Sequence, residues 1–240
     1  MTYAQEATAE PRASAGTNVI AGILAYLQDR RLQPGDRLPS ERDLAERLGV
    51  GRNAVREALA TLVTLRVVES RPNSGVYLRH MSRESSFEAL VLLTDIGATP
   101  TPTEVTETME VRAHLELLAV SLACQRRTDE DLARMEAILA RTDQTLEAGG
   151  NIAEMDTDFH IAVVDAAHNS VLVRTLNAFY RFTARRREVL FADHTQGLAS
   201  AREHRQMLEH ISNRDISKAE RLILQHMDRA TTYWSSYLET

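Results

Sequence analysis

Residues 34–62 read PGDRLPSERDLAERLGVGRNAVREALATL, and this stretch decides the fold of the N-terminal part of the chain. Ser40 has an acidic residue three positions later, which is the pattern of a helix N-cap. The segment 49–51 contains two glycines that end this short helix, and a second helix begins at Arg52. The second helix carries one apolar stripe at intervals of four and three, formed by Val55, Leu59 and Leu62. Two helices joined by a three-residue turn are typical of a helix-turn-helix.

The flanking segments complete a winged form of this motif. An amphipathic helix begins at Thr17, because apolar residues recur at helical spacing at Ile20, Ile23, Leu24 and Leu27. Beyond the second helix, residues 67–68 and 76–78 are mostly β-branched or aromatic and predict two short strands. The segment 71–75 contains proline, asparagine and glycine, and it predicts the turn between these strands.

The composition is that of a folded protein. The chain has 240 residues, of which 43% are hydrophobic and 26% charged, which excludes a disordered or fibrous chain and allows one large or two modest domains. No apolar run is long enough for a membrane helix, and the N-terminus lacks the apolar segment of a signal peptide. The single cysteine, Cys124, fits a reducing compartment. We therefore expect a cytoplasmic protein without a membrane partner.

Charge and secondary-structure pattern divide the chain in two. Residues 1–80 carry 11 arginines against 9 acidic residues, whereas residues 81–240 carry 17 basic residues against 25 acidic ones. From residue 82 onward nearly every segment has helical periodicity, including 151–167, 170–190, 199–212 and 215–238. We expect a mainly α protein with a flexible tail at 1–16, a winged helix-turn-helix at 17–80 and an all-α helical-bundle effector domain at 84–240.

The second helix of the motif has the residues expected of a DNA-reading helix. Arg52 and Arg56 lie four positions apart and share the face opposite the apolar stripe. The planar guanidinium pairs with O6 and N7 of guanine in the major groove, and the N-terminal end of the recognition helix lies nearest the bases. Asn53 and Arg42 are placed to contact a base or the backbone, and Gly75 lets the wing approach the duplex. The alternative is a solvated charged face.

The same residues carry a family resemblance. The stretch 34–62, followed by a hairpin and by SGVYL at 74–78, resembles the DNA-binding domain of the GntR family of bacterial transcription regulators over about residues 17–79. The resemblance implies that Arg42, Arg52, Arg56 and Gly75 contact operator DNA. The sequence departs from the family pattern at Gly51, Ala54 and Arg66, where relatives have hydroxyl residues at the first two positions and glycine at the third.

Four potential metal ligands fall on inward faces of the predicted C-terminal helices. Asp156 and His160 are four positions apart on an otherwise apolar face, and His204 and His226 each share a stripe with apolar residues. His210, by contrast, lies on a polar face and is expected to be solvated. One carboxylate and three imidazoles suit Zn²⁺ best, with Ni²⁺, Mn²⁺ or Fe²⁺ also possible. The alternative is a set of core histidines that bond to carbonyl groups.

A second resemblance covers the C-terminal part. The segments EVRAHLELLAVSLACQRR, DTDFHIAVVDAAHN and EHRQMLEHI, with the helix that contains His226, resemble the FadR-type (FCD) ligand-binding domain over about residues 84–238. In the metal-binding branch of that domain, an Asp, a His four positions later and one His on each of two later helices hold a divalent cation. The resemblance implies that role for Asp156, His160, His204 and His226.

Arg112 and Asn169 are weaker candidates for effector contacts. Arg112 stands near an inward face, where its guanidinium can bind a carboxylate with two hydrogen bonds. It also lies four positions before Glu116, which makes a salt bridge within one helix equally plausible. Asn169 precedes a predicted helix and has the alternative role of an N-cap.

These features together predict a regulator, most often a repressor in this family, whose operator affinity is controlled by a small carboxylate bound at the metal. A homodimer is expected, because two copies of one reading head match a pseudo-palindromic operator. The alternatives are a regulator that senses the metal itself, a metalloenzyme fused to a DNA-binding head, and an architectural DNA-binding protein. We expect no catalytic residues, since no general base accompanies the metal ligands. The sequence does not identify the effector or the operator.

Overall fold

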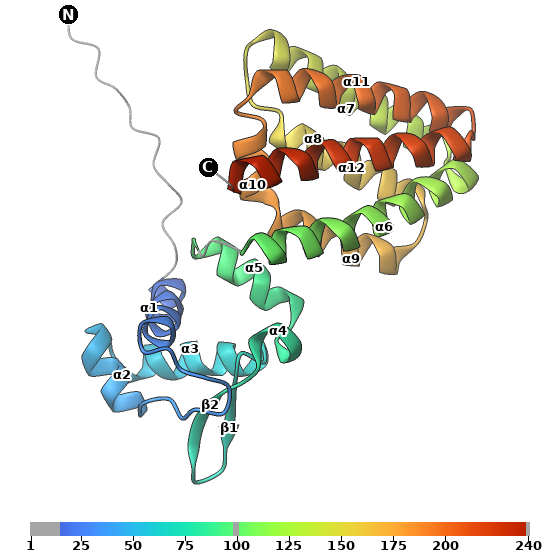
Figure 1. Cartoon of the computed structure of the whole chain (residues 1–240). Coiled ribbons are helices and arrows are strands. Elements are labelled where there is room, and N and C mark those ends of the chain that lie inside the picture. The colour runs from blue at the N-terminus through green and yellow to red at the C-terminus, as the bar shows by residue number, and fades with distance from the viewer. Residues whose placement is uncertain (1–14, 98–100, 239–240) are drawn as a thin grey trace, which may run out of the picture. The chain divides into compact units, whose positions relative to one another are not determined.

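A computed structural model describes residues 15–97 and 101–238 of the chain (Figure 1). The chain forms two compact units, and the division falls between residues 98 and 99. The two units are described separately below. The tail predicted at 1–16 lies outside the described residues up to residue 14, and Ala15 and Gly16 already belong to the first helix.

The first unit has the order of a winged helix-turn-helix. Ser40 caps the second helix by accepting a hydrogen bond from the Asp43 amide, with 3.3 Å between Oγ and N. Gly49 ends that helix in the left-handed conformation at φ 65°, which glycine adopts without steric cost. The elements of this unit are α1 (Ala15–Asp29), α2 (Glu41–Leu48), α3 (Arg52–Thr64), β1 (Val68–Arg71), β2 (Gly75–Leu78), α4 (Met81–Glu84) and α5 (Phe87–Asp95).

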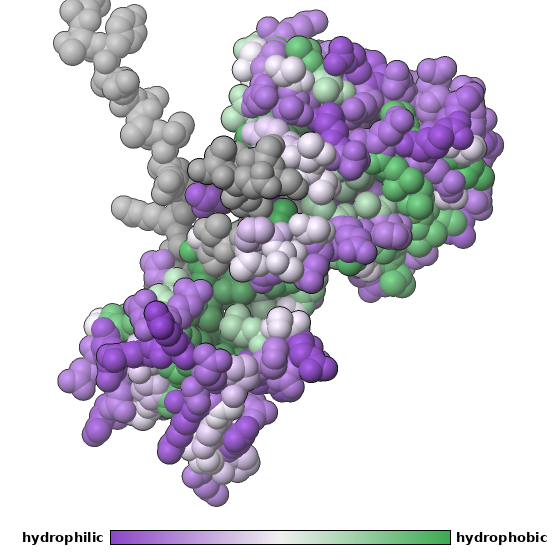
Figure 2. All heavy atoms as spheres, in the orientation of Figure 1, coloured by the Kyte–Doolittle hydropathy of each residue, from purple (hydrophilic) through white to green (hydrophobic). Residues whose placement is uncertain are grey.

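The apolar stripes predicted for these helices form the core of the first unit. Ile23 of α1, Leu44 of α2, and Val55 and Leu62 of α3 are completely buried. The helices α4 and α5 belong to the same unit, and Ala89 of α5 packs in the same core. Hydrophilic side chains dominate the visible surface over α2 (Figure 2).

The wing is a two-stranded antiparallel hairpin, in which Val68 pairs with Leu78 and Arg71 with Gly75. The segment before α2 joins it, because the Leu38 amide donates to the Val76 carbonyl at 2.8 Å and the Leu78 amide donates to the Asp36 carbonyl at 2.9 Å. These bonds attach the wing to the same segment that leads into the helix-turn-helix.

One departure from the family pattern, Arg66, lies in the connection from α3 to the wing. Arg66 adopts φ 58°, a left-handed conformation that is disfavoured for residues with a Cβ. Glycine at this position in relatives avoids that cost, so the arginine here is accommodated with local strain.

The second unit is entirely helical in its described part, residues 101–238. Capping boxes begin its first two helices, with Thr101 paired to Glu104 and Thr128 paired to Asp131. The helix α6 packs along α8 and α12, and α7 packs along α8 and α11. The helices are α6 (Pro102–Arg126), α7 (Asp129–Glu147), α8 (Ala153–Ala166), α9 (Ser170–Phe182), α10 (Ala184–Leu190), α11 (His194–Ser212) and α12 (Ile216–Leu238).

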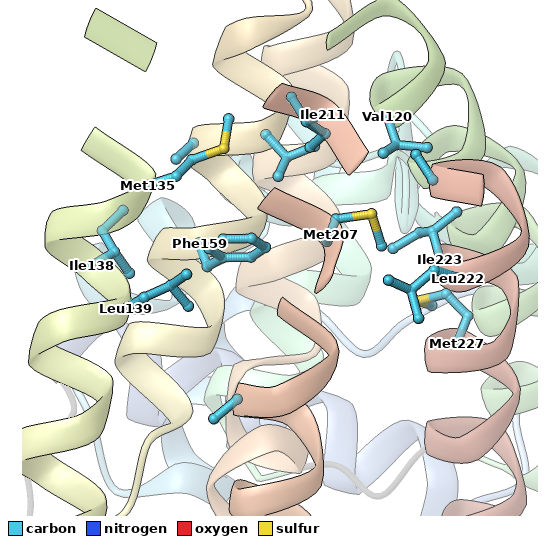
Figure 3. Packing of buried hydrophobic residues seen from close by; sticks show 14 of the residues in the cluster. Val120, Met135, Ile138, Leu139, Phe159, Met207, Ile211, Leu222, Ile223 and Met227 are labelled. Carbon is cyan, nitrogen blue, oxygen red and sulfur yellow. The ribbon is translucent and has the colours of Figure 1, made fainter. Parts of the chain in front are cut away.

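The core of this bundle is a continuous apolar cluster. Figure 3 shows Phe159 of α8 between Leu139 of α7 and Met207 of α11, with Ile223 of α12 on the far side of Met207. All four side chains are at least 95% buried. None of the helices in the described parts of the chain is long and apolar enough to cross a membrane.

One predicted helix is divided. The periodic stretch 170–190 forms α9 and α10, because the backbone leaves helical geometry at Thr183, where φ is −99° and ψ is 3°. The Thr183 hydroxyl donates to the Phe179 carbonyl and accepts from Nη1 of Arg187 at 2.6 Å. This break sets the rotation of α10 and hence the direction of its arginines.

Candidate metal centre and nucleic-acid interface

The predicted DNA-reading residues are exposed on the first unit. Arg52 and Asn53 lie in the first turn of α3, and Arg56 lies one turn later. Arg52 forms no ion pair with any described residue, so its guanidinium is available to a base edge. Gly51 is the N-cap of α3 and has no side chain that could accept a hydrogen bond from the free amides of the first turn. Free amides at a helix N-terminus are able to bind a phosphate group.

Acidic neighbours hold two of the other arginines. Nε and Nη2 of Arg56 lie 3.2 and 3.0 Å from Oε2 of Glu41, and Nε of Arg42 lies 3.7 Å from Oδ1 of Asp43. Both pairs are exposed to solvent, where such ion pairs contribute about 0–1 kcal/mol. DNA can therefore replace the acidic partners at small cost.

Gly75 has a structural reason to be glycine. Its φ is 122°, and a Cβ placed there would lie 2.8 Å from Nε of Arg37. Any side chain at this position would strain the backbone and displace Arg37. The sequence predicted that Gly75 lets the wing backbone approach DNA closely. Within the protein, the absence of a side chain at Gly75 also lets the Arg37 side chain lie close to the wing backbone.

The four predicted metal ligands converge in the second unit. Asp156 and His160 extend from α8, His204 from α11 and His226 from α12, and one donor atom of each lies within 4.8 Å of all the others. The four side chains are at least 95% buried. Nε2 of His160 lies 3.1 Å from Nε2 of His226. Oδ1 of Asp156 lies 3.5 Å from Nε2 of His204 and 3.9 Å from Nε2 of His160.

Two of these separations, 3.1 and 3.5 Å, are close to those of ligands on a common cation, and the 3.9 Å separation is longer. Two ligand atoms at 2.1 Å from a metal are about 3.0 Å apart at a right angle and about 3.4 Å apart at the tetrahedral angle. The tautomers point to the same conclusion, because the other ring nitrogen of His160 lies 3.3 Å from Oε2 of Glu116 and that of His226 lies 2.6 Å from Oε2 of Glu203. A carboxylate only accepts, so each Nδ1 carries the proton and each Nε2 presents a lone pair. Two lone pairs that face each other at 3.1 Å repel, and a metal ion between them would remove that repulsion.

The ionisation of the cluster suits metal binding. Burial lowers the pKa of His204 well below its ordinary value, and it also lowers the pKa of His226, so both rings are neutral. Burial alone would raise the pKa of Asp156, but positive charge around the carboxylate, including the Arg187 guanidinium 3.3 Å away, outweighs burial and holds that pKa below its ordinary value. Ser200 donates to Oδ1 of Asp156 at 2.9 Å, and Phe159 stacks on the His204 ring with 4.2 Å between centroids. The Asp156 carboxylate and the His204 ring are thus held in place.

A second layer of side chains supports these ligands, and sequence reasoning missed it. Glu116 of α6 accepts from His160, from Arg112 at 3.1 Å and from the Tyr180 hydroxyl at 2.6 Å. Glu203 of α11 accepts from His226 and, at 2.8 Å, from Nη2 of Arg229. Glu203 falls on the same predicted polar face as His210, and only the packing of α12 against α11 shows that it faces His226.

A small cavity borders the metal ligands. Its volume is about 30 Å³, enough for about two water molecules. Asp156 and His226 form one wall, and apolar side chains form much of the remainder. Four arginines line it: Arg112, Arg186, Arg187 and Arg229.

Arg112 and Asn169 both make the contacts that the sequence analysis gave as alternatives to effector binding, a salt bridge and a helix N-cap. Arg112 is buried, lines the cavity and donates to Glu116 through Nε and Nη2, so the salt bridge within α6 is present. Asn169 is the N-cap of α9, where Oδ1 accepts from the amides of Val171 and Leu172 at 3.1 and 3.2 Å. This cap accounts for Asn169 without an effector contact. His210 is half-buried and lies apart from the metal ligands, at an open groove between α11 and α12.

Comparison with known proteins assigns both units. The sequence matches the bacterial regulatory proteins of the gntR family over residues 16–78 and the FCD domain over residues 107–229. The chain belongs to the GntR family. It is a DNA-binding transcription regulator of the FadR-like subfamily, with a winged helix-turn-helix and an all-α FCD domain.

Curated relatives of this GntR-family chain are regulators and not enzymes. The HTH-type transcriptional regulator LutR of Bacillus subtilis (strain 168) is 31% identical over 219 residues, which cover 89% of this chain and 98% of the relative. The putative L-lactate dehydrogenase operon regulatory protein of Escherichia coli (strain K12) is 32% identical, over 66% of this chain and 60% of its own length. The Uxu operon regulator of Haemophilus influenzae is 28% identical, over 81% and 72%. The metalloenzyme alternative is therefore excluded.

Solved structures share the fold. One, described by the statement that Lar controls the expression of the Listeria monocytogenes agr system and mediates virulence, has a TM-score of 0.63 at 19% identity and covers 93% of this chain and 97% of its own. The structure of E. coli McbR/YncC has a TM-score of 0.54 at 20% identity and covers 94% and 99%. At these identities the similarity concerns the fold alone.

Proposed function

We propose that this regulator represses transcription from a short pseudo-palindromic operator and that a small carboxylate, bound at a divalent metal in the FCD domain, controls its affinity for that operator. The observation that carries the proposal is the pair of imidazole nitrogens that face each other at 3.1 Å beside an arginine-lined cavity. A cation between the nitrogens and an anion on the arginines would satisfy both sets of groups.

The metal that the four ligands favour is Zn²⁺, with Ni²⁺, Mn²⁺ and Fe²⁺ as the other ions that accept one carboxylate and three imidazoles. Asp156, His160, His204 and His226 would hold it. When bound, the ion would supply open coordination positions and positive charge to anchor a carboxylate. The near-complete burial of all four ligands favours a permanent cofactor, because a signalling ion needs a site that empties readily.

The effector class follows from the arginines. Arg112 and Arg187 are buried at the cavity and stack on Tyr180, with their Cζ atoms 5.1 and 5.0 Å from the ring centroid. Guanidinium groups fixed in this way recognise carboxylates with two parallel hydrogen bonds. One relative is named for an L-lactate dehydrogenase operon, and lactate is a small carboxylate, which supports the same class.

The operator would be read by Arg42, Arg52, Asn53 and Arg56, with the wing at Gly75 against the backbone. Two such heads in a homodimer would match the two half-sites of a pseudo-palindrome. A role on the chromosome would place the protein in the bacterial cytoplasm. The effector changes operator affinity only to the extent that it binds one arrangement of the dimer more tightly than another.

The test combines metal analysis with DNA binding. His226→Ala should lower the bound metal and the melting temperature of the full chain, whereas His210→Ala, the matched control, should change neither. An operator selected from random duplexes then serves in anisotropy titrations of metal-loaded protein with and without a panel of small carboxylates. Equal metal content in the two variants would refute the metal site. If chelation changes operator affinity and no carboxylate does, the metal is itself the signal.

A further inference from the structure

Two neighbouring arginines of α10 present unused donors at the cavity. Nη1 and Nη2 of Arg186 are buried without a hydrogen-bond partner among the described residues, and the same holds for Nε and Nη2 of Arg187. Arg187 as a whole is 96% buried. Buried guanidinium groups almost always have partners, since leaving one unsatisfied costs more than a single hydrogen bond contributes. Nε of Arg187 faces the Asp156 carboxylate, so three unsatisfied nitrogens remain, Nη2 of Arg187 and both terminal nitrogens of Arg186, and they point to an anion that completes them.

The charge balance requires more than one negative charge. Four arginines line the cavity, and three carboxylates lie among them: Asp156, Glu116 and Glu203. One positive charge is left over without the metal, and a divalent ion raises the excess to three. A monocarboxylate would leave two uncompensated charges in a buried site, and a ligand with two acidic groups would leave one. Uncompensated buried charge is strongly unfavourable, so the second acidic group is favoured.

The two arginines differ in what surrounds them. Nε of Arg187 lies 3.3 Å from Oδ2 of Asp156, which places this guanidinium beside a metal ligand. Arg186 forms no ion pair with any residue that the structure describes, and it lies over the Phe182 ring, with Cζ 4.8 Å from the centroid. Glu104 acts on Arg186 electrostatically, but its carboxylate is engaged in the capping box with Thr101. Arg186 therefore offers both terminal nitrogens to a group distinct from the one at the metal.

Apolar side chains line the cavity between these polar groups. Met109, Leu190 and Met227 are buried there, together with Phe191 and Trp234. Such walls suit the carbon skeleton of a short ligand and offer little to a chain of hydroxyl groups. The guanidinium groups of Arg112, Arg186 and Arg187 all line this one cavity, so they can act on a single ligand.

We propose that the effector is a short diacid whose first acidic group binds at the metal beside Arg187 and whose second acidic group, a carboxylate or a phosphate, binds both terminal nitrogens of Arg186. The inference rests on the proposed function, in which the effector occupies this cavity. It adds Arg186 as the residue that distinguishes diacids from monoacids. Arg186 was not a candidate from the sequence.

The test uses pairs of acids that differ only at the second group. Malate and 2-hydroxybutyrate share a four-carbon skeleton and differ by a carboxylate in place of a methyl group. Glycerate and 3-phosphoglycerate test a phosphate in the same role. Calorimetric titration of the zinc-loaded full chain should show at least tenfold tighter binding of a diacid than of its matched monoacid, since hydrogen bonds to a charged group contribute that much.

Variants at two adjacent arginines distinguish a role in binding the second acidic group from a role in stabilising the fold. Arg186→Met should reduce diacid affinity to that of the monoacid and leave monoacid affinity unchanged, and Arg186→Lys should restore part of the preference. Arg185→Met is the matched control, because Arg185 is exposed and lies outside the cavity lining. Without ligand, Arg186→Met should also raise the melting temperature, because it removes an uncompensated buried charge. A purely structural arginine would lower it.

The outcomes distinguish this inference from the proposed function. Monoacids that bind as tightly as diacids, or a diacid preference that survives Arg186→Met, would overturn the diacid inference and leave a carboxylate-responsive regulator intact. Failure of every acid to bind zinc-loaded protein would overturn both. Loss of monoacid binding in Arg186→Met would show that Arg186 supports the whole site and does not select the second group.

Discussion

Glu203→Gln measures how much a hydrogen-bond partner of a predicted metal ligand contributes to metal affinity. The Glu203 carboxylate lies 2.6 Å from Nδ1 of His226 and is itself held by Arg229. The substitution keeps the shape and removes the negative charge that fixes the tautomer of His226. A hydrogen bond to a charged group contributes about 1.5–3 kcal/mol, and a neutral one about 1 kcal/mol. The difference is about 0.5–2 kcal/mol, and loss of an outer partner typically weakens metal binding about 10–100-fold. Because the Glu203 side chain is 22% exposed, we expect the lower end of that second range, about tenfold or 1.4 kcal/mol.

The assay is competition between the protein and a chromophoric zinc chelator at pH 7.5. Glu209→Gln is the control, because Glu209 lies on the same helix, is exposed and has no contact with a metal ligand. Glu203→Gln should weaken zinc binding about tenfold, while the control retains the affinity of the unmodified chain. Equal zinc affinity in both variants would show that the bond to His226 does not tune the metal site, and the tautomer argument would then fail.

Three further predictions concern both units. Arg52→Ala should abolish specific operator binding without a change in melting temperature, and Arg83→Ala, an exposed arginine of the same unit, should not; unchanged operator affinity would refute the readout assignment. The metal-free protein should lose stability as the pH falls below about 6.5, because His204 and His226 stay neutral when folded but gain protons when unfolded. The slope should approach about 2.7 kcal/mol per pH unit in urea titrations, and a flat profile between pH 7.5 and 5.5 would contradict it. Arg66→Gly should stabilise the first unit by about 0.5–1 kcal/mol through relief of its left-handed backbone, and a lower denaturation midpoint would show that the side chain compensates for that strain.

Local sequence signals were sufficient for the fold of the DNA-binding unit and for selecting the four side chains that converge in the second unit. Caps such as Ser40 and breaks such as Gly49 act within one turn of backbone, so they can be read from the sequence. Asp156 and His160 were identifiable for a different reason, since polar residues on an apolar helix face need an explanation wherever that face packs. Their convergence with two histidines of later helices matches the resemblance to the FCD domain.

The residues around the metal site could not be found in the same way. Glu116 and Glu203 lie on helices whose rotation is fixed only by packing against α8 and α12. Arg186 and Arg187 face the cavity because the helix breaks at Thr183, and the uninterrupted periodicity of residues 170–190 gave no sign of that break. The sequence therefore identifies which face of each helix is apolar or polar, but the contacts between helices depend on tertiary packing and cannot be read from it.

The small size of the cavity has a consequence for the speed of the response. A space for about two water molecules cannot admit an organic acid until side chains of the wall move apart. The rate at which the regulator detects a rising metabolite is then limited by how often that movement occurs, and it reaches a ceiling at high metabolite concentration. Two metabolites that bind with different equilibrium affinities would consequently switch transcription at different concentrations but, at high concentration of either, after the same minimum delay.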